Sequence, residues 1–123
     1  MFKTFTVIAA VAALCAGCAA APEDIGPSYA SPMTYRDWTC DQLTDEGHRL
    51  AAAVRNASQR QDQARANDAL GVVLIGLPLG SMSGQNIAPE IGRLKGEHEA
   101  LYRVAVGKGC QTQIVPAATQ RPE

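Results

Sequence analysis

Four cysteines are the residues of this chain whose type and spacing point most clearly to chemistry. Cys15 and Cys18 stand three positions apart at the end of an apolar run. Cys40 and Cys110 instead flank the long central part of the sequence. A thiol can carry a lipid, form a disulfide, bind a metal or act as a redox group. The residues around each cysteine indicate which of these applies.

The residues before the first pair predict an exported chain. Lys3 is the only charged residue near the start, and an unbroken apolar block follows at 7–14. A positive start, a short apolar core and small residues after it are typical of a secretory signal peptide, which we expect to span 1–17. The block is much shorter than the roughly 20 residues that a membrane-spanning helix needs.

The first pair also lies in a recognisable signal. Ala16, Gly17 and Cys18 follow the apolar block, and this order resembles the lipobox of bacterial lipoproteins. The resemblance implies cleavage in front of Cys18, a thioether-linked diacylglycerol on its sulfur and usually a further acyl chain such as palmitate. Cys15 would be discarded with the signal, so the pair is not a redox site. Because Ala19 rather than Asp follows Cys18, the resemblance favours the outer membrane, facing the periplasm.

The two histidines are the other candidates for chemistry. His48 and His98, with acidic neighbours, could form a zinc site. His98 falls on an apolar helix face, however, and His48 is flanked by charged residues, which favours one packed and one surface histidine. Ser81 and Ser83 lie in a glycine-rich loop without a strand or a base beside them. We therefore expect no catalytic residue, no metal, no cofactor and no enzymatic activity.

A long helix is predicted to follow Cys40. Thr39 and Gln42 form a capping-box pattern at its start. Apolar and small residues then recur in alternating steps of four and three, which predicts one buried helix face. Its members are Leu43, Gly47, Leu50, Val54, Ala57, Gln61 and Ala64. Between 55 and 65 the sequence is polar nearly all round, and we interpret its Arg and Gln residues as a solvated surface. Contact with a polymer or a partner is the alternative.

A second helix is predicted from about 88 to 108. The same spacing links Ile87, Ile91, Leu94, His98, Leu101 and Ala105. A strip of small residues runs beside that face and consists of Ala88, Gly92, Gly96 and Ala100. Glycine inside a helix costs about 1 kcal/mol relative to alanine, so we expect the first helix to approach closely along this strip. A loose or kinked helix is the alternative.

The second cysteine pair connects the two helices. Cys40 starts the first helix and Cys110 follows the second, so the two meet at the open end of an antiparallel hairpin. The oxidising periplasm allows a disulfide there, and closing so long a loop contributes about 4 kcal/mol on the chain-entropy model. A bridge between two chains or a catalytic thiol is the alternative. The predicted fold is all-α: a two-helix antiparallel hairpin over 38–110, stapled by one disulfide.

The segments on either side of the hairpin lack helical periodicity. Residues 18–37 are rich in proline and alanine, with Pro22, Pro27 and Pro32 evenly spaced. We expect a lipid-anchored, disordered tether there, which lets the hairpin stand off from the membrane. Residues 111–123 are expected to form a disordered tail.

The most apolar segment after the signal lies between the two helices, at 69–84. Pairing of the arms from the disulfide would leave the end of the first helix, past roughly Gln61, without a partner. The side chains concerned form what we call the apolar tip, which consists of Val72, Val73, Leu74, Ile75, Leu77 and Leu79. Exposed apolar patches usually mark a contact. The expected occupants are a membrane surface, an envelope protein or a second copy, and the alternative is a tip that packs on its own hairpin.

From 40 to 110 the sequence is similar to small proteobacterial lipoproteins of unknown function. The similarity rests on the Thr-Cys-x-x-Leu helix start, the apolar centre, the Arg-Leu-Lys-Gly-Glu run at 93–97, Glu99-Ala-Leu101 and the closing cysteine. A net charge of −1 with 5% aromatic residues does not indicate a nucleic-acid partner.

We therefore expect a non-enzymatic structural or interaction module of the cell envelope, held to the membrane through Cys18. A small-ligand or metal-binding periplasmic module that uses the histidines is the alternative.

Overall fold

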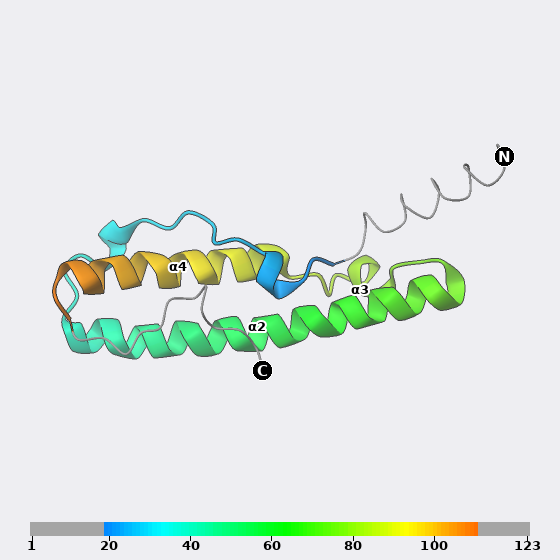
Figure 1. The fold of residues 1–123 in the computed structure, drawn as a ribbon, viewed down its shortest axis with the longest axis horizontal. Coiled ribbons are helices and arrows are strands. Elements are labelled where there is room, and N and C mark those ends of the chain that lie inside the picture. Colours follow the sequence, from blue (N-terminus) through cyan, green and yellow to red (C-terminus); the bar gives the residue numbers. More distant parts are fainter. Residues whose placement is uncertain (1–18, 111–123) are drawn as a thin grey trace.

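The helical hairpin predicted from the sequence is the centre of the fold. A computed structural model describes residues 19–110, and every regular element in that range is helical. The long helices α2 (Cys40–Ile75) and α4 (Ala88–Gly107) lie antiparallel, and the short helix α3 (Leu79–Met82) connects them (Figure 1). The expected signal peptide, the lipid site at Cys18 and the expected tail lie outside the described residues.

The predicted capping box starts α2. The backbone N–H of Gln42 donates to Thr39 Oγ1 (3.3 Å), and the N–H of Thr39 donates to Gln42 Oε1 (2.9 Å). These bonds satisfy backbone donors at the helix start that would otherwise lack a partner. The helix runs for 36 residues to Ile75 and is capped by Gly76, whose φ of 75° lies in the left-handed region that favours glycine. The predicted start is confirmed.

The predicted apolar faces of α2 and α4 pack against each other. Leu43, Leu50, Ile91 and Leu101 are fully buried between the helices. The other buried members of this core are Tyr35, Val54, Ala57, Leu94, Ala100 and Ala105. Burying a leucine or isoleucine side chain contributes about 1.5–3 kcal/mol, so this row of contacts is the main source of cohesion between the two arms.

The predicted disulfide closes the open end of the hairpin. The Sγ atoms of Cys40 and Cys110 are 2.07 Å apart, and their Cα atoms are 5.5 Å apart. At the same end, Lys108 Nζ donates to the backbone carbonyl of Trp38 (2.8 Å). The ring of Trp38 packs edge-on against Tyr35, with centroids 5.1 Å apart. The intramolecular pairing of the two cysteines is confirmed.

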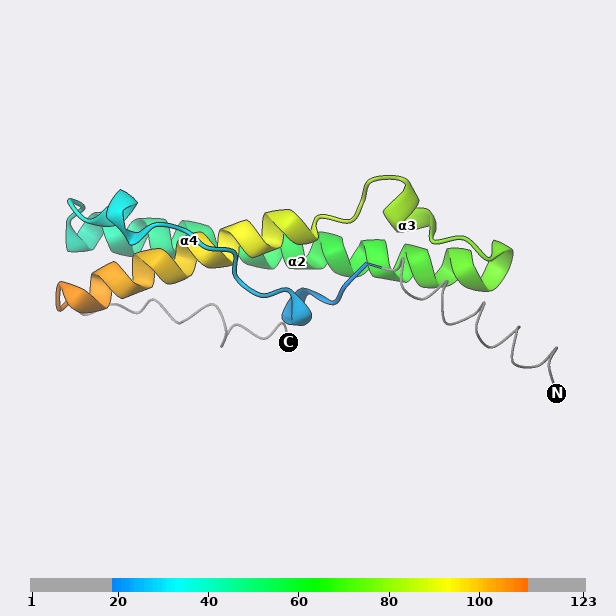
Figure 2. The same cartoon turned by 90° about the horizontal axis from the view of Figure 1, so that it is seen from above.

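Residues 19–37, which we call the N-terminal segment, differ from the prediction of a disordered tether. This segment lies along the hairpin (Figure 1, Figure 2). It includes two 3-10 turns, η1 (Pro22–Asp24) and η2 (Pro32–Tyr35). Tyr35 is only 6% exposed, and Lys95 Nζ of α4 donates to the carbonyls of Pro22 (2.6 Å) and Ile25 (2.8 Å). The boundary predicted at residue 38 is therefore wrong, because side chains of the hairpin bind backbone carbonyls of this segment and hold it against the helices.

Two glycines of α4 make room for the N-terminal segment. A Cβ added at Gly96 would lie 1.8 Å from the carbonyl oxygen of Ser28, and one added at Gly92 would lie 2.8 Å from Ser28 Oγ. The N–H of Ser28 also donates to the carbonyl of Gly92 (2.8 Å). The close approach predicted along this strip is confirmed. The predicted partner is wrong, because the N-terminal segment rather than α2 fills the space.

Candidate functional site

The two arms of the hairpin differ in length, and this leaves one end of α2 with a separate set of partners. α2 has 36 residues and α4 has 20. The N–H of Ile87, just before α4, donates to Gln61 Oε1 (2.8 Å), which marks the level at which the pairing of the arms begins. Beyond that level, α3 and its flanking loops return along α2 (Figure 2).

Gln61 joins three segments at this level. Its side chain is fully buried. Nε2 donates to the carbonyl of Ala20 (3.0 Å) in the N-terminal segment and to Asn86 Oδ1 (3.0 Å) in the loop before α4. Because Oε1 accepts from Ile87, both ends of this buried amide are hydrogen-bonded, which offsets the cost of burying it.

Asp68, two turns further along α2, repeats this arrangement with a charged group. Its carboxylate is fully buried. Oδ2 accepts from the N–H of Ala19 (2.9 Å) and from Ser81 Oγ (2.6 Å), and Oδ1 accepts from the N–H of Ser81 (2.6 Å). Burial by itself would raise the pKa of Asp68, but the hydrogen bonds from Ser81, Ala19 and Gly80 outweigh it and lower the pKa below the usual aspartate range. We refer to Gln61 and Asp68 with their bonded partners as the polar cluster.

Only part of the polar cluster is predictable from the sequence. The spacing places Gln61 on the buried face, but the interpretation of the Arg and Gln residues at 55–65 as solvated is wrong for this residue. Asp68 follows Ala64 by four positions and precedes Gly71 by three, so the same spacing continues through it. The signal for burial was therefore present, whereas the hydrogen-bond partners lie in segments far away along the sequence.

Two glycines allow the returning chain to lie directly on α2. A Cβ added at Gly71 would lie 2.3 Å from the carbonyl oxygen of Leu77, and one added at Gly80 would lie 2.3 Å from the carbonyl oxygen of Ala64. Both contacts are to backbone atoms, which cannot move aside as a flexible side chain can. Glycine is therefore needed at position 71 before the turn that follows α2 and at position 80 after it.

The apolar tip lies at this turn, and most of its side chains point into solvent. Val73 is 81% exposed, Leu74 is 69% exposed and Leu77 is 43% exposed. The other two exposed members are Ile75 and Leu79, while Val72 is half-buried. The neighbouring side chains of Leu70 and Met82 are exposed as well. The backbone of this region folds back on the hairpin, but its large side chains do not.

The tip is also free of charge. No Asp, Glu, Lys or Arg occurs from residue 69 through residue 89. Among the helices of residues 19–110, none combines the length and the apolar character required to cross a bilayer. The end of the molecule opposite the disulfide is thus an exposed, uncharged and apolar surface without a membrane-spanning helix.

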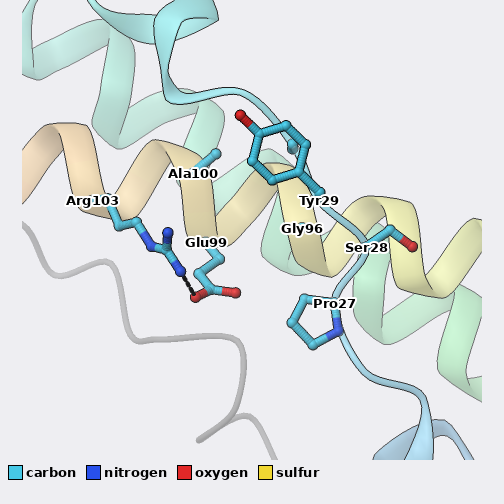
Figure 3. A pocket seen from close by; sticks show the side chains of 8 residues that line it. Pro27, Ser28, Tyr29, Gly96, Glu99, Ala100 and Arg103 are labelled. Carbon is cyan, nitrogen blue, oxygen red and sulfur yellow. Dashed lines mark hydrogen bonds and ion pairs between the residues drawn. The ribbon is translucent and has the colours of Figure 1, made fainter.

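A shallow groove of about 210 Å³ lies between α4 and the N-terminal segment (Figure 3). Glu99 and Arg103 border it and form an ion pair with each other, with side chains 41% and 65% exposed. Tyr29 lies across the groove and is also exposed. Ligand sites usually fix their ligand with a few enclosed polar groups. The charged groups of this groove are instead paired and open to solvent.

The two histidines do not meet in a common site. His98 is 1% exposed, and neither of its ring nitrogens has a hydrogen-bond partner. Burial lowers the pKa of His98, because it disfavours the charged imidazolium form. His48 is exposed on α2. Within residues 19–110, no three His, Cys, Asp or Glu side chains cluster closely enough to hold a metal ion.

Comparison with known proteins adds no further constraint on the site. No family model, curated protein or solved structure matches this chain. Functional inference therefore depends on the two features described above, the polar cluster and the apolar tip.

Proposed function

We propose that this chain is a lipoprotein of the bacterial cell envelope that works as a non-enzymatic interaction module. A lipid on Cys18 holds it to the membrane, and the apolar tip makes its functional contact. The observation that carries the proposal is the group of large apolar side chains exposed at the end of the hairpin.

The energetics of a small domain support a contact at the tip. Apolar surface left in water forgoes about 25 cal/mol per Å², and several side chains of the tip are more than half exposed. The net stability of a domain is only about 5–15 kcal/mol. Exposed apolar groups that remain together at one end of such a small fold are typical of a surface that is covered in use.

The anchor half of the proposal is supported by the resemblance of Ala16-Gly17-Cys18 to a lipobox. Each methylene buried in a bilayer contributes about 0.8 kcal/mol, so a single acyl chain binds marginally, whereas two or three bind durably. A lipid on Cys18 would therefore hold the chain at the membrane without a spanning helix.

Replacement of each cysteine of the first pair tests the anchor. Cys18→Ser should abolish labelling of the chain by a radioactive fatty acid and leave an uncleaved precursor. Cys15→Ser is the matched control and should still be labelled and cleaved, because Cys15 belongs to the discarded signal. Undiminished labelling of the Cys18→Ser chain would contradict the anchor.

Site-specific photocrosslinking in intact cells tests the tip. A photoreactive phenylalanine at Val73 should give adducts, because this side chain is 81% exposed at the tip. The same residue at Val106, which is 55% exposed at the disulfide end of α4, is the control and should give few. Equal yields at both positions would show that the tip is not a preferred contact.

A further inference from the structure

We infer that the occupant of the apolar tip is the lipid surface of the same membrane that holds the anchor on Cys18. The apolar tip then contacts the bilayer, and the Cys40–Cys110 disulfide lies at the end of the hairpin farthest from it. This inference rests on the proposed anchor and adds the identity of the contact and the orientation of the molecule.

The described part of the chain begins close to the apolar tip. The N–H of Ala19 donates to Asp68 Oδ2 (2.9 Å), so Ala19 lies beside the second half of α2. Consecutive Cα atoms are about 3.8 Å apart, so a lipid on the residue before Ala19 would be attached within reach of this part of α2. Asp68 precedes Ile75, the last residue of α2, by seven positions, or about 10 Å along the helix axis. The lipid is therefore attached close to the tip.

The residues directly after Cys18 are held against the fold and do not form a flexible linker. Ala19 and Ala21 are both buried, and the carbonyl of Ala20 accepts from Gln61 Nε2. A tether of twenty free residues would let the hairpin turn in any direction. Since the chain is held to α2 from its first residue after Cys18, lipid chains that enter the bilayer bring the tip with them.

The surface that would face the lipid is apolar and uncharged. Residues 69–89 carry no charge, so seating this region in a bilayer surface buries no charged group. The nearest exposed charge on α2 is Arg65, which pairs with Asp62 (3.2 Å) about two turns back from Val72. A charged band at that distance limits how deeply the tip can enter. An apolar tip bounded by charge fits the interfacial layer of a membrane.

Tryptophan quenching by brominated lipids tests the orientation. The lipidated full chain is purified from membranes and reconstituted into phosphatidylethanolamine–phosphatidylglycerol vesicles with brominated acyl chains. Trp38→Phe removes the only tryptophan, and Leu74→Trp or Val106→Trp then reports on the tip or on the disulfide end. Both positions are exposed apolar sites, at 69% and 55%, so the pair is matched. Circular dichroism and non-reducing electrophoresis verify that each variant is folded and oxidised.

We expect the tryptophan at position 74 to lose most of its emission and the one at position 106 to lose none. Equal quenching at both positions would mean that the hairpin lies flat, and would overturn the inference. A lipidated, vesicle-bound chain without quenching at position 74 would also overturn it, in favour of a protein partner or a second copy. A chain whose mass shows no lipid would overturn the proposed anchor and this inference together, so the two failures are distinguishable.

Discussion

At the scale of single residues, Asp68 is a fully buried charged group that joins separate segments of the chain. Its buried carboxylate accepts hydrogen bonds from Ala19 and Ser81, and so links the N-terminal segment to α3. Asp68→Ala should lower the free energy of unfolding by about 2–3 kcal/mol, since bonds to a buried charge are lost and their donors stay buried. Urea denaturation measures this. Asp62→Ala removes an exposed carboxylate two turns earlier and should change stability by less than about 0.5 kcal/mol. Equal losses in the two variants would contradict the assigned role.

His98 should make the fold sensitive to mild acid. Burial lowers the pKa of His98, so the unfolded chain, with an ordinary histidine pKa of about 6.5, binds this proton more readily than the folded chain. Stability should therefore fall as the pH drops below about 6.5 and continue to fall until the folded pKa is reached. His98→Leu should flatten this dependence in denaturant titrations, whereas His48→Leu, at an exposed site, should keep it. An unchanged profile in the His98→Leu chain would contradict the interpretation.

Asp68 should affect the pH dependence of stability in a lower pH range than His98 does. Its folded pKa is lowered, so its stabilisation is present above the ordinary aspartate pKa of about 4. That stabilisation is lost as the pH falls through the folded value. The His98→Leu chain should therefore still lose stability in strong acid. A chain that combines Asp68→Asn with His98→Leu should lose less stability over the same pH range than the His98→Leu chain.

At the scale of elements, the N-terminal segment depends on small residues of α4. Gly96→Ala would place a Cβ 1.8 Å from the carbonyl oxygen of Ser28. The segment would have to shift, so we expect lower thermal stability and faster proteolysis within residues 19–37. Helix propensity alone would favour alanine by about 1 kcal/mol. Gly107→Ala is the matched control, because a Cβ there meets no atom within 4 Å, and it should be neutral or stabilising. A stabilised Gly96→Ala chain would show that the close approach does not constrain the fold.

Local signals explain which elements could be predicted from the sequence. The capping box of Thr39 and Gln42 and the four-three spacing of the helices act over a few residues, and both are confirmed. The N-terminal segment has no such pattern of its own. Its conformation is set by Lys95, Gln61 and Asp68, which are 41 to 73 residues away from the groups that they bind. A prediction based on local composition therefore assigns it to a tether.

At the scale of the whole molecule, the disulfide and the apolar tip occupy opposite ends of α2. The replacement of Cys40 and Cys110 together by alanine should lower the free energy of unfolding by about 4 kcal/mol, because the bridge closes a loop with a sequence separation of 70. Reductant should destabilise the unmodified chain by a similar amount and leave the double variant unchanged. Equilibrium denaturation with and without reductant measures both effects. A loss below about 1 kcal/mol would mean that helix packing alone holds the arms together.

The candidate site was predictable in part at this scale. Unequal arms and an apolar segment between them indicate a tip, and the exposed side chains of the structure lie where the sequence analysis expects them. The polar cluster beside the tip was not predicted. It needs the backbone of Ala19 and Ala20 against α2, and the sequence analysis assigns those residues to a free tether.

The residues that bind the N-terminal segment are synthesised long after the segment itself, so it must dock late. A chain is made and exported from its N-terminus. Ala19 must await Asp68, 49 positions later, and Pro22 and Ile25 must await Lys95, 73 and 70 positions later. The segment of the fold that is made first thus contains the residue that waits over the longest stretch of sequence for its partner, since Pro22 and Lys95 are 73 positions apart. The proposed cleavage and acylation at Cys18 can therefore occur while the N-terminal segment is still undocked. Docking of the segment on the hairpin would later limit the approach of the processing enzymes.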